Sequence, residues 1–236
     1  MIAAALALAF AAPASAAEVS VGVKPGDGVR LGNATTISGR VTEQGAPLAD
    51  RTVRLEIRKH PFRGPWKPQA AAKTDADGRY SFAPVLRRNH HIRVRLDGLP
   101  ATAYTSAQPD TLSARRNAYV LPAFTLSFKQ RGARKIRISQ TYTVPKAVKL
   151  TAPTRFYVGP CKPNTRDECT ATTAPFAKQA PTRRVRAGRY LARATVPIPA
   201  SFGGRFSYVS CFPYSKGSGM GKPDQRCPRK SVKLSR

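Results

Sequence analysis

Side chains suited to acid–base chemistry are few and scattered along the chain. The three histidines, His60, His90 and His91, are accompanied by neither a Gly-x-Ser-x-Gly elbow nor a His-Glu-x-x-His helix. Asp167 and Glu168 are adjacent and lie among basic residues, which favours local ion pairs over an acid–base couple. The sequence therefore predicts histidines at the surface or at strand ends, no catalytic residue, and a protein that is not an enzyme.

Two other clusters have residue types that bind ions. Asp75 and Asp77 are reminiscent of a calcium loop, but such a loop needs a Glu eleven residues after Asp75, where Leu86 stands. The run Gly-Ser-Gly-Met-Gly at 217–221 lacks the helix that follows a phosphate loop, so we interpret it as a flexible loop tip. Neither cluster predicts a metal or a cofactor.

The four cysteines all lie in the second half of the chain: Cys161, Cys169, Cys211 and Cys227. Three pairings are possible, and we expect the local one, 161 with 169 and 211 with 227, because each pair brackets a proline-rich or polar loop. Each bridge would stabilise the fold by about 2–4 kcal/mol. The alternative is a zinc site, which the spacing does not favour because neither pair is separated by two to four residues.

Positive charge is the most unusual property of the sequence. The formal net charge is +29, of which +8 falls up to Ala118 and +21 from Tyr119 onward. A charge of this size attracts anionic polymers. The expected binding residues are cations in the outward phase of predicted strands: Lys135, Arg137, Lys149, Arg184, Arg186 and Arg193. The alternative is that composition alone placed these cations on solvated strand faces.

Turn-forming residues and alternating hydrophobic residues indicate which strands and turns position the side chains named above. At 74–82, Asp75, Asp77 and Gly78 are turn formers, and they predict a β-hairpin with strands at 70–73 and 79–82. Short alternating segments continue on both sides, and no helical period persists. The sequence predicts an all-β chain of two tandem antiparallel β-sandwiches of Ig-like or prealbumin-like type, at 17–108 and 119–236, joined by a linker at 109–118.

Part of the first predicted sandwich carries a family resemblance. Residues 38–41, 45–48 and 53–55, together with Trp66 and the acidic turn at 74–82, resemble bacterial carboxypeptidase regulatory-like and related Ig-like domains. The resemblance covers residues 37–96, and no family is recognised for the C-terminal half. It implies a β-sandwich that serves as a non-catalytic module of an exported bacterial protein.

The first 16 residues have the pattern of a signal peptide. An apolar run at 2–12 is followed by Pro13 and by the small residues Ala14, Ser15 and Ala16, which a signal peptidase accepts. No basic residue precedes the apolar run. We expect an exported protein that is secreted or associated with the cell envelope without a transmembrane anchor.

Two classes of function follow. The first is an envelope-associated or adhesion module without catalytic activity, whose basic C-terminal domain binds an anionic cell-wall polymer, an acidic polysaccharide or extracellular nucleic acid. The second is an extracellular hydrolase with an unfamiliar site in the cysteine-bracketed loops, for which a pocket would have to gather Asp167, Glu168 or Asp224. A spacer with no ligand is a third possibility.

Overall fold

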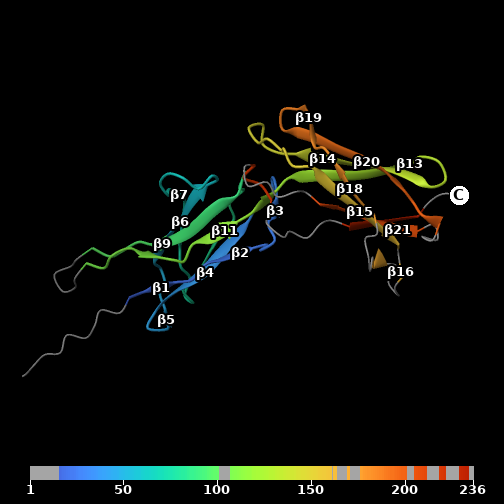
Figure 1. Cartoon of the computed structure of the whole chain (residues 1–236). Helices are drawn as coiled ribbons and strands as arrows, with labels where there is room; N and C mark the ends of the chain where they lie inside the picture. Colours follow the sequence, from blue (N-terminus) through green and yellow to red (C-terminus); the bar gives the residue numbers. More distant parts are fainter. Residues whose placement is uncertain are drawn as a thin grey trace, which may run out of the picture.

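The computed structural model describes residues 16–100, 107–160, 162–163, 169–170, 176–200, 205–211, 218–221 and 229–233 (Figure 1). Its regular structure over these ranges is built from β-strands, which confirms the all-β fold class. No helix in this described part is long and apolar enough to cross a membrane. Of the expected signal peptide at 1–16, only Ala16 lies within the described residues.

The first sheet of the N-terminal half is organised around β4 (Thr36–Glu43). Ile37 and Val41 are fully buried on one face of β4, because alternate side chains of a strand point to the same side. Four shorter strands pair with β4. They are β1 (Glu18–Val19), β2 (Gly22–Lys24), β5 (Ala46–Pro47) and β8 (Arg79–Phe82).

The second sheet of this half runs in the order β10–β9–β6–β7, with β11 also paired to β9. Val53, Leu55, Ile92 and Val94 are fully buried on its inner face, as the alternation of these segments predicts. The strands are β6 (Thr52–Lys59), β7 (Lys67–Lys73), β9 (His90–Leu96), β10 (Thr111–Leu112) and β11 (Arg116–Ala118).

The segment 109–118, expected as a linker, is instead built into this second sheet. Thr111 of β10 pairs with Leu96 of β9, and the three residues of β11 pair with the start of β9. Ala118 at the end of β11 is fully buried. The segment looks like a linker in sequence because these short edge strands leave most of their polar side chains exposed to solvent.

The acidic turn forms as expected, but it does not close a hairpin. Asp75 Oδ1 accepts hydrogen bonds from the backbone N–H groups of Asp77 (3.0 Å) and Arg79 (2.7 Å), and Gly78 has a φ of +72°. However, β7 pairs with β6 in the second sheet, whereas β8 pairs with β4 in the first. The prediction of a hairpin was wrong because turn residues specify a reversal of the chain and not the partner of each strand.

Two four-stranded sheets form most of the C-terminal half, in the orders β13–β14–β20–β19 and β18–β15–β21–β22. Ile136 and Ile138 of β14, and Phe156 and Val158 of β15, have no exposed surface. The strands of the two sheets are β13 (Ala123–Gln130), β14 (Lys135–Thr143), β15 (Thr154–Pro160), β18 (Phe176–Ala180), β19 (Arg183–Arg186), β20 (Arg189–Pro197), β21 (Arg205–Cys211) and β22 (Arg229–Lys233). A further short pair joins β16 (Lys162–Pro163) to β17 (Cys169–Thr170).

The halves meet at a short parallel pair of strands, β3 (Val29–Arg30) and β12 (Val120–Leu121). Figure 1 shows the blue and green strands of the N-terminal half at one end and the yellow and orange strands of the C-terminal half at the other. Residues 218–221, which we call the junction segment, lie against β12: the N–H of Gly221 donates to the carbonyl of Val120 (2.9 Å).

Asn89 holds the junction segment in place. Its backbone N–H donates to the carbonyl of Gly219 (2.8 Å), and its side-chain Nδ2 donates to the carbonyl of Gly221 (2.8 Å). Its Oδ1 accepts from the N–H of Val120 (2.8 Å), and Met220 beside it has no exposed surface. The prediction of a flexible loop tip at 217–221 is therefore wrong for the described residues 218–221, which are buried against the N-terminal half.

Candidate functional site

The outward face of the sheet β13–β14–β20–β19 carries most of the cations of these strands. In β14, Ile136, Ile138 and Gln140 are buried, whereas Lys135 is exposed and Arg137 is half-buried on the opposite face. Directly paired residues of neighbouring strands point to the same face of the sheet. The register therefore shows which cations of β13, β19 and β20 share a face with Lys135 and Arg137. We call this surface the basic face, and its cations are Lys129, Lys135, Arg137, Arg183, Arg186, Arg189 and Arg193.

Four of the six cations expected to bind a polyanion lie on the basic face: Lys135, Arg137, Arg186 and Arg193. Arg184 does not, because it pairs with Tyr190, whose side chain is buried on the inner face. Lys149 is exposed in the loop between β14 and β15 and belongs to no strand. The structure thus places these two cations apart from the other four.

Three cations of the basic face were not among the binding residues expected from the sequence: Lys129, Arg183 and Arg189. Lys129 follows the alternation of β13, so the pattern contained the signal. Arg183 could not be assigned in this way, because a register shift between Arg184 and Arg186 reverses the phase within β19. This β-bulge brings Arg186 opposite Arg189, on the same face as Arg183.

Among the described residues, no carboxylate compensates the cations of the basic face. The four strands of its sheet have no Asp or Glu, and the sequence has none at all between Asp110 and Asp167. The ion pairs between two described residues all lie between positions 50 and 110, in the N-terminal half. The cations of the basic face therefore have no acidic partner among the described residues.

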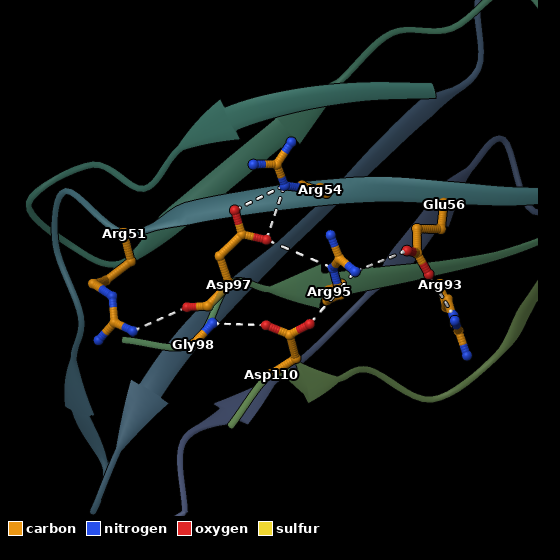
Figure 2. Close-up of polar contacts among 8 residues, drawn as sticks. All are labelled: Arg51, Arg54, Glu56, Arg93, Arg95, Asp97, Gly98 and Asp110. Carbon is orange, nitrogen blue, oxygen red and sulfur yellow. Dashed lines mark hydrogen bonds and ion pairs between the residues drawn. The ribbon is translucent and has the colours of Figure 1, made fainter. Parts of the chain in front are cut away.

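The outward face of the second sheet shows the opposite arrangement (Figure 2). Arg54 Nε lies 2.8 Å from a carboxylate oxygen of Asp97, and Arg93 Nε lies 2.7 Å from Glu56. Arg95 lies between Glu56, Asp97 and Asp110, with N–O distances of 3.4–3.7 Å. This face of the N-terminal half neutralises much of its own charge.

Trp66 extends this ordered network. The guanidinium groups of Arg58 and Arg93 lie 4.6 and 4.5 Å from the centre of its ring, within the range of a cation–π contact. Neighbouring His91 is covered by Phe62, whose ring is stacked on it at 3.8 Å. These aromatic side chains are engaged within the protein.

The arrangement of titratable groups offers no acid–base site in the described residues. Burial lowers the pKa of His90, whose Nδ1 lies 2.6 Å from the carbonyl of Arg88, and burial and nearby arginines lower the pKa of His91. No three His, Cys, Asp or Glu side chains gather to form a metal site in the part of the chain that is described. Asp167, Glu168 and Asp224 lie outside it.

The cysteine predictions also fall outside the described side chains. Cys161 and Cys227 are not described, and of Cys169 and Cys211 only the backbone positions in β17 and β21 are. The predicted disulfides therefore stay a prediction.

A hollow of about 610 Å³ lies over β4, β8 and the end of β7. Its charged lining residues are Arg40, Lys73, Asp75 and Arg79. The carboxylate of Asp75 accepts hydrogen bonds from the backbone of the turn. Arg40 donates to the backbone carbonyl of Asp77, and Arg79 donates to its carboxylate. The hollow therefore has no carboxylate available for acid–base work, which gives no support to a hydrolase.

No protein-family model and no curated protein matches the sequence. Among solved structures, the chain is similar to the apo structure of Bacteroides uniformis β-glucuronidase 3, at 12% identity and a TM-score of 0.24 over 94% of this chain. It is also similar to a β-glycosidase from Bacteroides vulgatus, at 10% identity and a TM-score of 0.24 over 92% of this chain. This chain spans 25% of the length of each, and a likeness at this TM-score carries no argument about function.

Proposed function

We propose that this protein is an exported, envelope-associated binding module without catalytic activity, and that its basic face binds an anionic polymer. In this proposal the halves are two tandem β-sandwiches, the first of the carboxypeptidase regulatory-like, Ig-like type. The observation that carries the proposal is the contrast between the two outward faces: Arg54, Arg93 and Arg95 of the N-terminal face are paired with carboxylates. The cations of the basic face have no carboxylate partner among the described residues.

Uncompensated cations on a strand face attract a polyanion by a simple mechanism. Each cation that neutralises an anionic group of a polymer releases a condensed counterion, so the affinity falls as salt rises. The slope of log K against log salt is about −0.7 to −0.9 for each neutralised charge of a nucleic acid. If five to seven cations of the basic face bind, we expect a slope of about −4 to −6.

A column of immobilised heparin tests this proposal. The purified protein is expected to bind at 50 mM salt and to elute late in a salt gradient. The variant Arg186→Gln/Arg189→Gln/Arg193→Gln, in which three exposed cations of the basic face lose their charge, is expected to elute at clearly lower salt.

The matched control is Arg63→Gln/Lys67→Gln/Arg87→Gln, which removes three exposed cations from the N-terminal half and lowers the net charge equally. We expect this control to elute near the unmodified protein. Equal shifts of the two variants would show that total charge, and not the basic face, governs binding. Failure of the unmodified protein to bind at 50 mM salt would end the proposal.

A further inference from the structure

The cations of the basic face follow a diagonal across its sheet. Arg186 and Arg189 lie at one corner, on β19 and β20, in the same row of paired residues as Thr143. In the next row that points outward, Arg183 is paired with Leu191, and in the outward row after it Arg193 is paired with Ser139. The row after that contains Arg137 and Lys129, on β14 and β13, and Lys135 follows near the opposite corner.

Strand geometry gives the length of this diagonal. The rows extend from Arg189 to Pro197 along β20, which at about 3.3 Å per residue is roughly 26 Å. The line also crosses three gaps between neighbouring strands, each about 4.8 Å wide. The cations are therefore spread along about 30 Å in a narrow line, not clustered at a single point.

Most positions between the cations carry hydroxyl groups, and none carries an aromatic ring. Outward-facing residues of the rows include Thr125, Ser127, Ser139, Thr141, Thr143 and Thr195. The aromatic residues of these strands occupy the other phase: Tyr142 and Tyr190 are buried, and Phe124 and Phe128 pair with Tyr142 and Ile138, which are buried. Proteins that bind single-stranded nucleic acid through its bases present aromatic rings for stacking, and this face presents none in its strands.

We infer that the ligand of the basic face is a single extended polymer whose anionic groups lie along its backbone. The polymer follows the diagonal, and guanidinium, ammonium and hydroxyl groups contact its phosphate, sulfate or carboxylate groups. Bases or other rings attached to the backbone add little to binding, because no aromatic side chain of the face receives them. This inference rests on the proposed function and names the chemical class of the ligand.

The test measures binding by fluorescence anisotropy at 50 mM salt with two labelled phosphodiesters of equal length, oligothymidylate and its abasic counterpart. We expect their affinities to agree within about twofold, since stacking of each base would otherwise contribute about 1–3 kcal/mol. A tenfold or greater preference for oligothymidylate would overturn the inference while leaving the proposed function intact. If neither phosphodiester, nor inorganic polyphosphate, nor heparin binds, the proposed function itself fails.

The diagonal is tested with two triple variants of the C-terminal half. Lys129→Gln/Arg183→Gln/Arg193→Gln removes three exposed cations from the diagonal, and Lys149→Gln/Arg155→Gln/Arg184→Gln removes three exposed cations that lie off it. We expect the first variant to bind the abasic oligomer at least tenfold more weakly with a salt slope smaller by about two to three, and the second to change affinity less than threefold. Equal weakening by the two variants would overturn the diagonal.

Discussion

At the scale of single residues, the arginines of this protein differ in whether they form an ion pair with a carboxylate. Arg93 lies between Glu56 and the ring of Trp66, and Arg95 lies among three acids. Glu56 itself is buried, with 8% of its side chain exposed, because two arginines close over it. Removing the carboxylate of a buried ion pair is destabilising because it leaves the cationic partners uncompensated, whereas losing an exposed pair costs little.

Replacing Glu56 by Gln tests the structural role of this network. The change leaves Arg93 and Arg95 without their shared partner, so we expect the free energy of unfolding to fall by about 1–3 kcal/mol. The control is Asp50→Asn, which breaks the exposed pair with Lys73 and should change stability by less than about 1 kcal/mol. Urea denaturation measures both, and equal effects would contradict this account of Glu56.

His90, which is buried, and His91, which is half-buried, predict a dependence of stability on pH. Burial is the main cause that lowers the pKa of His90, and burial followed by Arg115 and Arg58 lowers that of His91. Because these folded-state pKa values lie below the unfolded value of about 6.5, the unfolded chain binds more protons as the pH falls. The stability associated with the neutral histidines is therefore complete above about pH 6.5 and is lost below it.

The measurement is the urea midpoint at pH 7.5 and pH 5.0. We expect the unmodified protein to lose more stability between these pH values than His90→Gln/His91→Gln does. Above pH 7.5 the two curves should run parallel, since both histidines are then neutral. Identical losses on acidification would refute a role for these two side chains.

At the scale of elements, alternation predicted most strands, and two errors arose from a β-bulge and from the choice of strand partners. The short alternating segments of the C-terminal half form strands such as β20 and β21. Arg184 was assigned to the wrong face because the β-bulge in β19 has no signature in the residue types. The pairing of β8 with β4 was also not predicted, because the two strands are about 40 residues apart in the sequence and no local pattern specifies that they pair.

Gly78 shows how the turn between the sheets is fixed. It has a φ of +72°, and a Cβ atom at this position would lie 2.4 Å from the carbonyl oxygen of Val41. Gly78→Ala should therefore suffer both backbone strain, about 1–2 kcal/mol, and a clash that moves the turn away from β4. The control Gly45→Ala has a φ of +81° with no atom within 4 Å, so it reports the strain alone.

Thermal and urea denaturation of the two glycine variants give the comparison. We expect Gly78→Ala to be less stable than Gly45→Ala by at least about 1 kcal/mol, which is the contribution of the clash. If the two variants are equally stable, the close approach of the turn to β4 does not exist in solution.

At the scale of the whole molecule, the junction segment connects the end of the chain to its N-terminal half. Asn89 makes hydrogen bonds to Gly219, Gly221 and Val120, and Met220, between the two glycines, has no exposed surface. The sequence could not reveal this, because a run rich in Gly and Ser has the composition of an exposed loop. Its burial arises from contacts with residues about 130 positions earlier.

Truncation of Met220 tests this connection. Met220→Ala leaves a cavity and should lower the free energy of unfolding by about 2–5 kcal/mol. Met220→Leu conserves the volume and should cost less than about 1.5 kcal/mol. An alanine variant as stable as the leucine variant would show that the side chain of Met220 is not packed in the folded protein.

The central claim is that the uncompensated cations of β13, β14, β19 and β20 form a surface that binds polyanions. The most direct measurement is the change in backbone amide NMR shifts when a heparin oligosaccharide is added to the labelled protein at low salt. We predict that the largest shifts fall on residues of the basic face, such as Arg137 and Arg193, and that they vanish as salt is raised. Shifts concentrated instead on β6 and β9, or no shifts at all, would contradict the claim.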